Sequence, residues 1–214
     1  MSAAERLLQS RLIGIVRVDD LDVAVASAAC AIEAGLQVIE VTFTLASAAR
    51  AIERLRGEHP AALIGAGTVR TLNELEDAAA AGAEFIVAPG LNPDLLERAR
   101  RREILMIPGV LTASEVDAAL RLGVPLLKLF PAEPLGPAYM ASLLQPFPAA
   151  AMIPTGGITA ANAPAYLQAG AAAVAMGSSL FPARRIKAEG PGVVAPLVAE
   201  ALAAVRTESI GGRK

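Results

Sequence analysis

Lys128 is one of only three lysines in this 214-residue chain, and it lies in an apolar run, Val124-Pro125-Leu126-Leu127-Lys128-Leu129-Phe130-Pro131. A lysine is almost never fully buried without a reason. Burial disfavours the ammonium form, and a neutral amine is a nucleophile that forms Schiff bases with carbonyl compounds. The residue therefore predicts an enzyme that processes a carbonyl substrate. The alternative is an edge-strand lysine whose stem packs while its charged end reaches water.

A second titratable residue, Glu40, lies in the apolar segment Gln37-Val38-Ile39-Glu40-Val41, so we expect its carboxylate to point into the protein. Burial raises the pKa of a carboxyl group, whereas a nearby cation lowers it. A glutamate close to a lysine would provide a proton shuttle for chemistry between an amine and a carbonyl. A purely structural ion pair is the alternative.

Short apolar strands alternate with helical segments along the chain, which predicts a parallel sheet with helical crossovers. The expected strands are 12–18, 37–43, 62–65, 85–88, 105–107, 126–130, 151–153 and 172–176. The expected helices are 21–34, 47–56, 72–81, 93–102, 113–121, 160–168 and 193–205. This pattern predicts an α/β fold, a single (β/α)8 TIM barrel with a short N-terminal helix, as one domain over residues 1–214.

Proline follows four successive predicted strands, with spacings of 19, 23 and 23 residues, at Pro89, Pro108, Pro131 and Pro154. Proline cannot donate to a central ladder, so each proline is expected to mark the end of a strand. In barrels of this kind the C-terminal ends of the strands carry the active site.

Other polar residues and glycines also follow predicted strands. Arg17 ends the first strand, and its guanidinium suits a carboxylate or a phosphate, although an ion pair with Asp19 or Asp20 is an alternative. Thr42, Thr44 and Thr68 could hydrogen-bond a carboxylate. The last two strands precede Gly156-Gly157 and Gly177-Ser178-Ser179, and phosphate often binds to backbone N–H groups at this place in such barrels.

The composition excludes several other classes of function. A net charge of −2 gives no reason to expect a nucleic acid or a membrane as partner. One cysteine, Cys30, and one histidine, His59, exclude an internal disulfide and a Cys- or His-rich metal site. The stretch 134–183 has no charged residue, but prolines and glycines interrupt it, so we interpret it as buried core. Without an apolar leader segment, a cytoplasmic enzyme is expected.

Taken in order, seven motifs closely resemble the class I 2-keto-3-deoxy-6-phosphogluconate (KDPG) aldolase / 4-hydroxy-2-oxoglutarate aldolase family. They extend over most of the chain and are Ile39-Glu40-Val41-Thr42, Gly65-Ala66-Gly67-Thr68-Val69, Ala88-Pro89-Gly90, Ile107-Pro108-Gly109-Val110, Leu127-Lys128-Leu129-Phe130-Pro131-Ala132-Glu133, Pro154-Thr155-Gly156-Gly157-Ile158 and Met176-Gly177-Ser178.

The resemblance implies Schiff-base cleavage of a phosphorylated keto acid to pyruvate and an aldehyde. Lys128 and Glu40 would be the catalytic residues, no metal or cofactor would be needed, and the enzyme would be a homotrimer. Thr68 would contact pyruvate, Thr155 would lie near the aldehyde, and the glycine motifs would hold the phosphate. The predicted substrate-binding residues are Arg17, Thr44, Thr68, Pro89, Phe130, Thr155, Gly156, Gly157, Gly177 and Ser178.

One position departs from the family pattern, in which an arginine that grips the pyruvate carboxylate often follows the glutamate motif. This chain has Thr44 there, and we hypothesise that Arg17, on the adjacent strand, supplies the charge. Two other functions are weighed against the aldolase. One is a sugar-phosphate epimerase or isomerase that uses Glu40 and Lys128 without covalent chemistry, and the other is a non-catalytic protein that binds phosphorylated metabolites.

Overall fold

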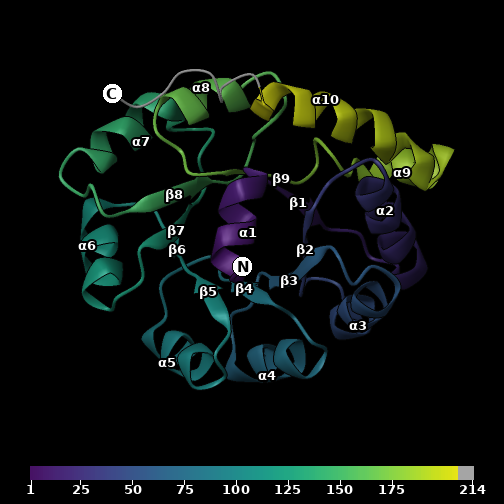
Figure 1. Ribbon diagram of the computed structural model, residues 1–214, viewed down its shortest axis with the longest axis horizontal. Coiled ribbons are helices and arrows are strands. Elements are labelled where there is room, and N and C mark those ends of the chain that lie inside the picture. The colour runs from purple at the N-terminus through teal and green to yellow at the C-terminus, as the bar shows by residue number, and fades with distance from the viewer. Residues whose placement is uncertain (207–214) are drawn as a thin grey trace.

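The computed structural model describes residues 1–206 and places parallel strands at the centre of a ring of helices (Figure 1). The strands are β1 (Leu12–Val16), β2 (Val38–Thr42), β3 (Leu63–Gly67), β4 (Phe85–Val87), β5 (Leu105–Ile107), β6 (Gly109–Val110), β7 (Leu126–Leu129), β8 (Ala151–Pro154) and β9 (Val174–Met176).

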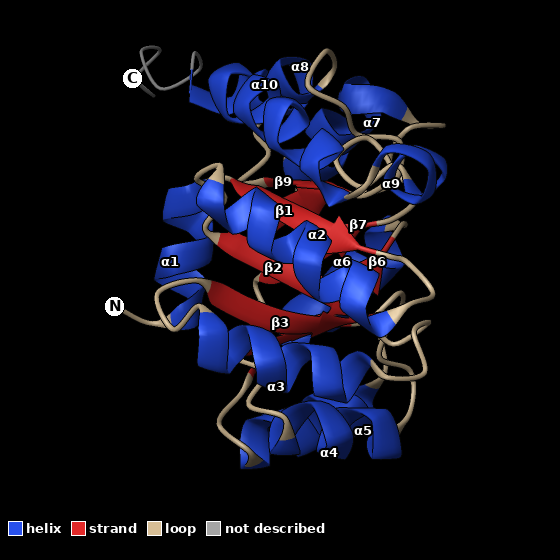
Figure 2. Ribbon diagram, turned by 90° about the vertical axis from the view of Figure 1, so that its right-hand side faces the viewer, coloured by secondary structure: helices blue, strands red, loops and turns tan. Residues whose placement is uncertain are grey.

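The helices cover the outer face of the strands, except for α1, which lies across the opening at the strands' N-terminal ends (Figures 1 and 2). They are α1 (Ala3–Ser10), α2 (Leu21–Glu33), α3 (Ala48–Glu58), α4 (Leu72–Ala80), α5 (Pro93–Arg101), α6 (Ala113–Arg121), α7 (Gly136–Leu144), α8 (Ala163–Gln168), α9 (Ala183–Glu189) and α10 (Val194–Arg206), with a 3₁₀ turn at Pro191–Val193.

Local sequence signals explain where several helices begin. The residue before each of α1, α4 and α6 is a serine or threonine that forms a capping box with the glutamate three residues later, in which each side chain accepts the other residue's backbone N–H. In α5 the cap is Asn92, followed by a proline at the first helical position, where its missing N–H costs no bond.

The strands form two parallel sheets. Six strands pair in the order β5-β4-β3-β2-β1-β9, and the other three pair in the order β6-β7-β8. The sheets meet between β8 and β9, where Thr155 bridges Ala175 and the Ala172 N–H donates to the Met152 carbonyl at 2.9 Å. The α/β class with parallel strands therefore agrees with the sequence, but the ladder is not the continuous ring that was expected.

The break between the sheets lies at Pro108. β5 pairs with β4 up to Ile107, and after the proline β6 pairs with β7 instead. Pro108 has no N–H to donate, but its carbonyl accepts the Lys128 N–H at 2.9 Å. Pro108 therefore follows the end of β5, as was expected, although the chain resumes pairing at once in β6, from Gly109. Pro154 also marks a strand end, because it is the last residue of β8 and pairs there with Leu129.

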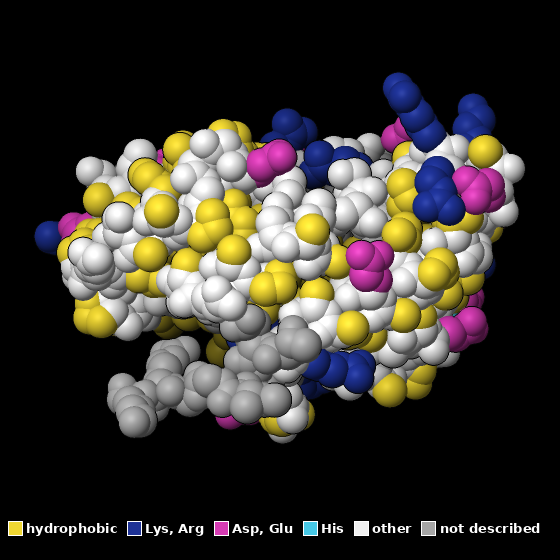
Figure 3. All heavy atoms as spheres, turned by 90° about the horizontal axis from the view of Figure 1, so that it is seen from above, with side chains coloured by type: hydrophobic (Ala, Val, Ile, Leu, Met, Phe, Trp, Pro, Cys, Tyr) yellow, Lys and Arg dark blue, Asp and Glu magenta, His cyan; other side chains and the backbone are white. Residues whose placement is uncertain are grey.

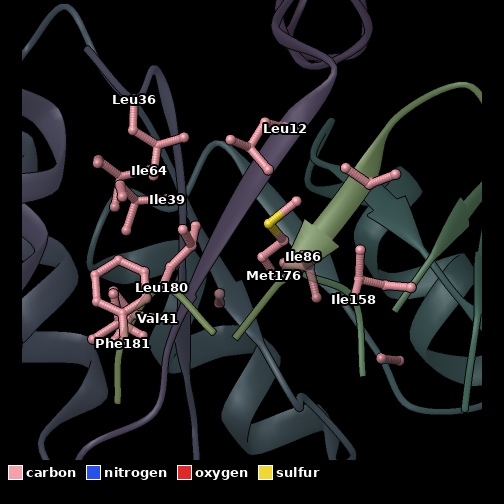
Figure 4. Close-up of a cluster of buried hydrophobic side chains, with 14 of the residues drawn as sticks. Leu12, Leu36, Ile39, Val41, Ile64, Ile86, Ile158, Met176, Leu180 and Phe181 are labelled. Atoms are coloured by element: carbon pink, nitrogen blue, oxygen red, sulfur yellow. The ribbon is translucent and has the colours of Figure 1, made fainter. Parts of the chain in front are cut away.

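Side chains point alternately to the two faces of each strand, which divides the hydrophobic core into two clusters. One face of the strands packs against the surrounding helices, and part of this layer appears in Figure 4, where Leu36, Ile39 and Phe181 lie close together. The other face encloses a smaller interior cluster whose members come from both sheets and from α1; it includes Ile13, Val38, Leu63, Phe85, Ile107, Leu126, Ile153 and Leu7.

Three elements were missed from the sequence. β6 is only two residues long, and α7 and α9 lie in segments that have weak helical patterning. The uncharged stretch 134–183 is not wholly buried core, because α7, α8 and their loops expose residues such as Leu135, Ala138 and Gln145. These exposed segments are rich in proline, alanine and glycine, so they contact solvent although they contain no charged residue. Within residues 1–206, no helix has the length and apolar character needed to cross a membrane.

Leu7 anchors α1 to the interior cluster and is completely buried, whereas Leu8 is 36% exposed. Leu7→Ala should lower the free energy of unfolding by about 2–5 kcal/mol, because it leaves a cavity beneath α1. Leu8→Ala, the matched control, should change it by no more than about 0.5 kcal/mol. Chemical denaturation would measure both, and equal effects would contradict this placement of α1.

Candidate active site

Lys128 lies on β7 and points into the interior. Its neighbours Leu127 and Leu129 belong to the outer layer, while Leu126 belongs to the interior cluster, so the two-residue period of the strand turns Lys128 inward. The residue is only 5% exposed. The alternative of an edge-strand lysine with its charged end in water is therefore wrong, because β7 is paired on both sides by β6 and β8.

Glu40 lies on β2 and reaches the same interior. The residue is 1% exposed, and its Oε1 atom has no hydrogen-bond partner among the described residues. Burial raises the pKa of the Glu40 carboxyl above its ordinary value, while the charges of Lys128 and Arg17 act in the opposite direction. No ion pair joins Glu40 to Lys128 within 4.0 Å in residues 1–206, so a tight structural pair is not what holds them there.

Gly67 supplies the space that the Glu40 carboxyl group occupies. A Cβ atom built on Gly67 would lie 1.8 Å from Glu40 Oε1, so no other residue fits without displacing the carboxylate. The next residue, Thr68, has a φ of 57°, a left-handed conformation that a β-branched residue rarely adopts. Such strained backbone is concentrated at functional sites. The end of β3 thus shapes the space between Glu40 and the mouth, by which we mean the opening at the C-terminal ends of the strands.

Arg17 stands at the mouth, just beyond the end of β1. Its Nη2 atom donates to Thr68 Oγ1 at 3.3 Å. Asp20 does not pair with it but caps α2 by accepting the Val23 N–H, and among residues 1–206 Arg17 forms no ion pair. Thr44 is exposed, and its hydroxyl lies 2.8 Å from the hydroxyl of Thr42. The guanidinium is therefore held at the mouth by a hydroxyl group and not by an ion pair with any described carboxylate.

A cavity of about 240 Å³ opens at the C-terminal ends of the strands. It brings together most of the residues predicted from the sequence, namely Arg17, Lys128, Phe130, Thr155, Gly156, Gly157, Gly177 and Ser178. Thr68 joins this group through its hydrogen bond to Arg17, and Glu40 lies buried beside it. Two predicted residues, Thr44 and Pro89, do not line this cavity.

The cavity also has apolar walls that the sequence analysis missed, formed by Ile15, Ile158, Phe181 and Ala183. Ile15 had a usable signal, because it precedes Arg17 by two residues and so shares its face of β1. Phe181 lies just before α9 and Ala183 is the first residue of this helix, which was not expected, so nothing in the strand pattern pointed to them.

The loop after β8 contains two glycines with positive φ, 91° for Gly156 and 74° for Gly157. Its carbonyls are held by side chains behind the cavity: Asn162 donates to the Gly157 carbonyl at 2.9 Å, and Ser179 donates to the Ile158 carbonyl at 2.7 Å. Glycine lets the backbone approach a ligand closely. The loop is therefore a fixed, glycine-lined wall without a cation of its own.

A second cavity, of about 450 Å³, lies at the other end of the strands beside α1. Its charged lining residue, Arg6, is already bound to Glu84 at 3.1 Å and to the Ala61 carbonyl at 2.7 Å. The smaller cavity is instead lined by a buried lysine, a glycine loop and an arginine that forms no ion pair within residues 1–206, and the buried carboxyl group of Glu40 lies beside it. That combination makes the smaller cavity the candidate active site. No cluster of three or more His, Cys, Asp or Glu residues suited to a metal occurs within residues 1–206.

Comparisons with known proteins agree on one family. The family model for KDPG and KHG aldolase matches residues 3–195. The chain is 38% identical to a 2-dehydro-3-deoxy-phosphogluconate aldolase of Treponema pallidum over 185 residues, 86% of this chain and 88% of that protein. It is 34% identical to the KHG/KDPG aldolase of Escherichia coli K12 over 202 residues, 94% of this chain and 95% of that one.

A solved structure gives the same result. The KDPG aldolase of Legionella pneumophila, with pyruvate captured at low pH as a covalent carbinolamine intermediate, has a TM-score of 0.85 and 32% identity. The match covers 94% of this chain and 98% of that chain.

The raised pKa of Glu40 predicts a pH dependence of stability. The folded chain binds this proton more tightly than the unfolded chain, so stability falls as pH rises above the ordinary glutamate pKa of about 4.3. Glu40→Gln removes this loss. The free energy of unfolding of the variant, relative to wild type, should therefore increase between pH 4 and pH 8.

Urea denaturation across that range would measure the slope. Glu53→Gln, at an exposed site on α3, is the control and should leave the difference constant. A flat difference for Glu40→Gln would contradict the burial argument, whatever constant offset the buried amide introduces.

Proposed function

Because the chain belongs to the KDPG and KHG aldolase family, we propose that it is a class I aldolase, a lyase that releases pyruvate from a 2-keto-4-hydroxy acid through a Schiff base on Lys128. The observation that carries the proposal is the placement of a lysine, 5% exposed, and a glutamate, 1% exposed, in one interior next to a cavity. Within residues 1–206, neither side chain forms an ion pair that would explain its burial.

The reaction begins when the Lys128 amine attacks the C2 ketone and gives a carbinolamine. Loss of water then gives an imine, whose protonated form withdraws electrons from C3. Glu40, acting through a water molecule, removes the proton of the C4 hydroxyl, and the C3–C4 bond breaks. The aldehyde leaves, and the electron pair of the broken bond remains as a pyruvate enamine on Lys128.

Glu40 completes the cycle by returning a proton to C3 of the enamine, after which hydrolysis frees pyruvate and the amine. A general acid–base works best when its pKa is near the working pH. The burial that raises the Glu40 pKa moves the carboxyl group toward that condition. The iminium supplies the electron withdrawal that a Lewis acid would otherwise give, so the proposed chemistry uses no cofactor.

Arg17 is proposed to bind the carboxylate of the keto acid. It lines the cavity, hydrogen-bonds Thr68 and has no acidic partner in residues 1–206. Thr44 and Pro89 do not line the cavity, and both are proposed to contact the substrate at the edge of the site.

The outer part of the substrate is proposed to meet Phe130, Thr155, Gly156, Gly157, Gly177 and Ser178, which line the cavity toward the two last loops. Backbone N–H groups of such loops suit a phosphate. KDPG, which gives glyceraldehyde 3-phosphate, and 4-hydroxy-2-oxoglutarate, which gives glyoxylate, are the proposed substrates. Cleavage assays with these two and with the phosphogalactonate isomer of KDPG, using Lys128→Ala as the blank, would rank them.

The proposal also includes the overall fold. We infer that the two sheets are parts of one (β/α)8 barrel in a single domain over residues 1–214, since the interior cluster draws on both sheets and β5 continues through Pro108 into β6. Unfolding curves should then show one transition. Location in the cytoplasm and action in carbohydrate metabolism stay predictions from the sequence.

A homotrimer is proposed, because the uncharged stretch 134–183 forms part of the surface around α7 and α8. In Figure 3 the left part of the view, on the side of α7 and α8, shows mainly hydrophobic and uncharged side chains. Interface cores are depleted in charged residues, so the face suits contact with further copies of the chain. Sedimentation equilibrium should give three times the monomer mass of 21.9 kDa, and a monomer would contradict this assembly.

Reduction with borohydride in the presence of pyruvate tests the central claim. The wild-type chain should retain a reduced pyruvate adduct on Lys128, located by peptide mass spectrometry. Lys187→Ala should keep the adduct and Lys128→Ala should lose it. An epimerase or isomerase would form no adduct, and a protein that only binds phosphorylated metabolites would also show no cleavage, so absence of the adduct would refute the Schiff-base proposal.

Arg17→Ala tests the carboxylate site. Loss of a charge-assisted hydrogen bond costs about 1.5–3 kcal/mol, so the KM for the keto acid should rise roughly 10- to 100-fold. Arg121→Ala, at a surface pair with Asp117, is the control and should leave KM unchanged. An unaltered KM in Arg17→Ala would show that another group binds the carboxylate.

A further inference from the structure

We propose that the ring of Phe130 stabilises the positive charge on the Lys128 nitrogen, first as ammonium and later as protonated imine. This inference rests on the proposed Schiff-base function and gives Phe130 an electrostatic role instead of a simple contact with substrate. The charge on this nitrogen is central to the chemistry, because the protonated imine is what draws electrons from the breaking bond.

The first observation is the position of the amine over the ring. Lys128 Nζ lies 5.0 Å from the centroid of Phe130. The face of an aromatic ring carries partial negative charge, and a cation within about 6 Å of the centroid is attracted to it. The attraction is larger where water is excluded, and Lys128 is only 5% exposed.

The second observation is that the ring is seated between the amine and the glycine loop. A Cβ atom on Gly156 would lie 3.3 Å from Phe130 Cε2, so the ring lies close against the backbone of this loop. Phe130 lines the cavity and is 37% exposed, so it does not serve to fill the hydrophobic core. Its position is therefore that of a wall of the active site.

The charged groups that face the amine explain why an aromatic partner is useful. Glu40 on β2 and Arg17 beyond β1 share its surroundings, and Glu133 follows Phe130 on the next loop; β6 and β8, the strands that flank β7, contribute no charged residue. Glu40 must gain and lose a proton during the reaction, so its charge is absent for part of the cycle. The ring does not titrate, and its attraction for a cation persists throughout.

The proposal predicts two effects of opposite sign. A Phe130 ring with less negative charge on its face should destabilise the iminium and slow cleavage of the C–C bond. It should also destabilise the ammonium form, so that a larger fraction of Lys128 is the free amine and reacts with a neutral electrophile at a given pH. A ring that serves only as packing would not produce both effects together.

Graded fluorination of Phe130 tests this, because each added fluorine weakens the negative face of the ring with little change of shape. Phenylalanine with one, two or three fluorines would be placed at position 130 of the full chain. The logarithm of kcat should fall steadily with fluorine number, by roughly 2- to 30-fold in total. The rate at which acetic anhydride modifies Lys128, measured against Lys187 by mass spectrometry, should rise along the same series.

Phe147 provides the matched control, since it packs partly buried against the outer core and does not line the cavity. Fluorination there should change neither rate. If neither rate follows fluorine number at position 130, or if both fall together, the proposal is overturned. If the unmodified chain forms no imine with pyruvate, the proposed function fails, while the acetylation series still decides whether the ring holds the ammonium.

Discussion

The structure depends on keeping a carboxyl group and an amine in one buried interior without joining them in a tight ion pair. Glu40 Oε1 lacks a partner among the described residues, and Lys128 rests over the Phe130 ring. An uncompensated buried polar group costs free energy. The surrounding strands must therefore be stable enough to hold both groups in place, which the apolar layers on the two faces of the sheets provide.

Glycine at two neighbouring positions of β3 makes that interior possible. A Cβ on Gly65 would meet the Phe85 ring at 2.5 Å, and one on Gly67 would meet Glu40 Oε1 at 1.8 Å. The first glycine admits a large apolar side chain to the interior cluster, and the second admits the carboxyl group above it. A single short strand thus sets the boundary between the packed interior and the chemical site.

Much of this arrangement was predictable because strand burial and strand period are local properties. The apolar runs around Lys128 and Glu40 placed both residues inside, and all of the expected strands lie within a few residues of the observed ones. The two-residue β6 could not be predicted from the sequence, because its pairing depends on a hydrogen bond between strands, from the Lys128 backbone N–H to the Pro108 carbonyl. The absence of Thr44 and Pro89 from the cavity lining likewise depends on tertiary geometry that no motif spacing records.

α1 lies across the N-terminal ends of the strands (Figure 2), whereas the cavity lined by Lys128 lies at their C-terminal ends, so the reactants and products of the proposed reaction share that side of the molecule. In the proposed reaction, the carbon bound to Lys128 lies deep in the cavity, while the glycine loops hold the outer fragment nearer the opening. The outer fragment consequently obstructs the inner one and has to depart first. This imposes a sequence on the turnover, aldehyde before keto acid, which patterns of inhibition by each product would reveal.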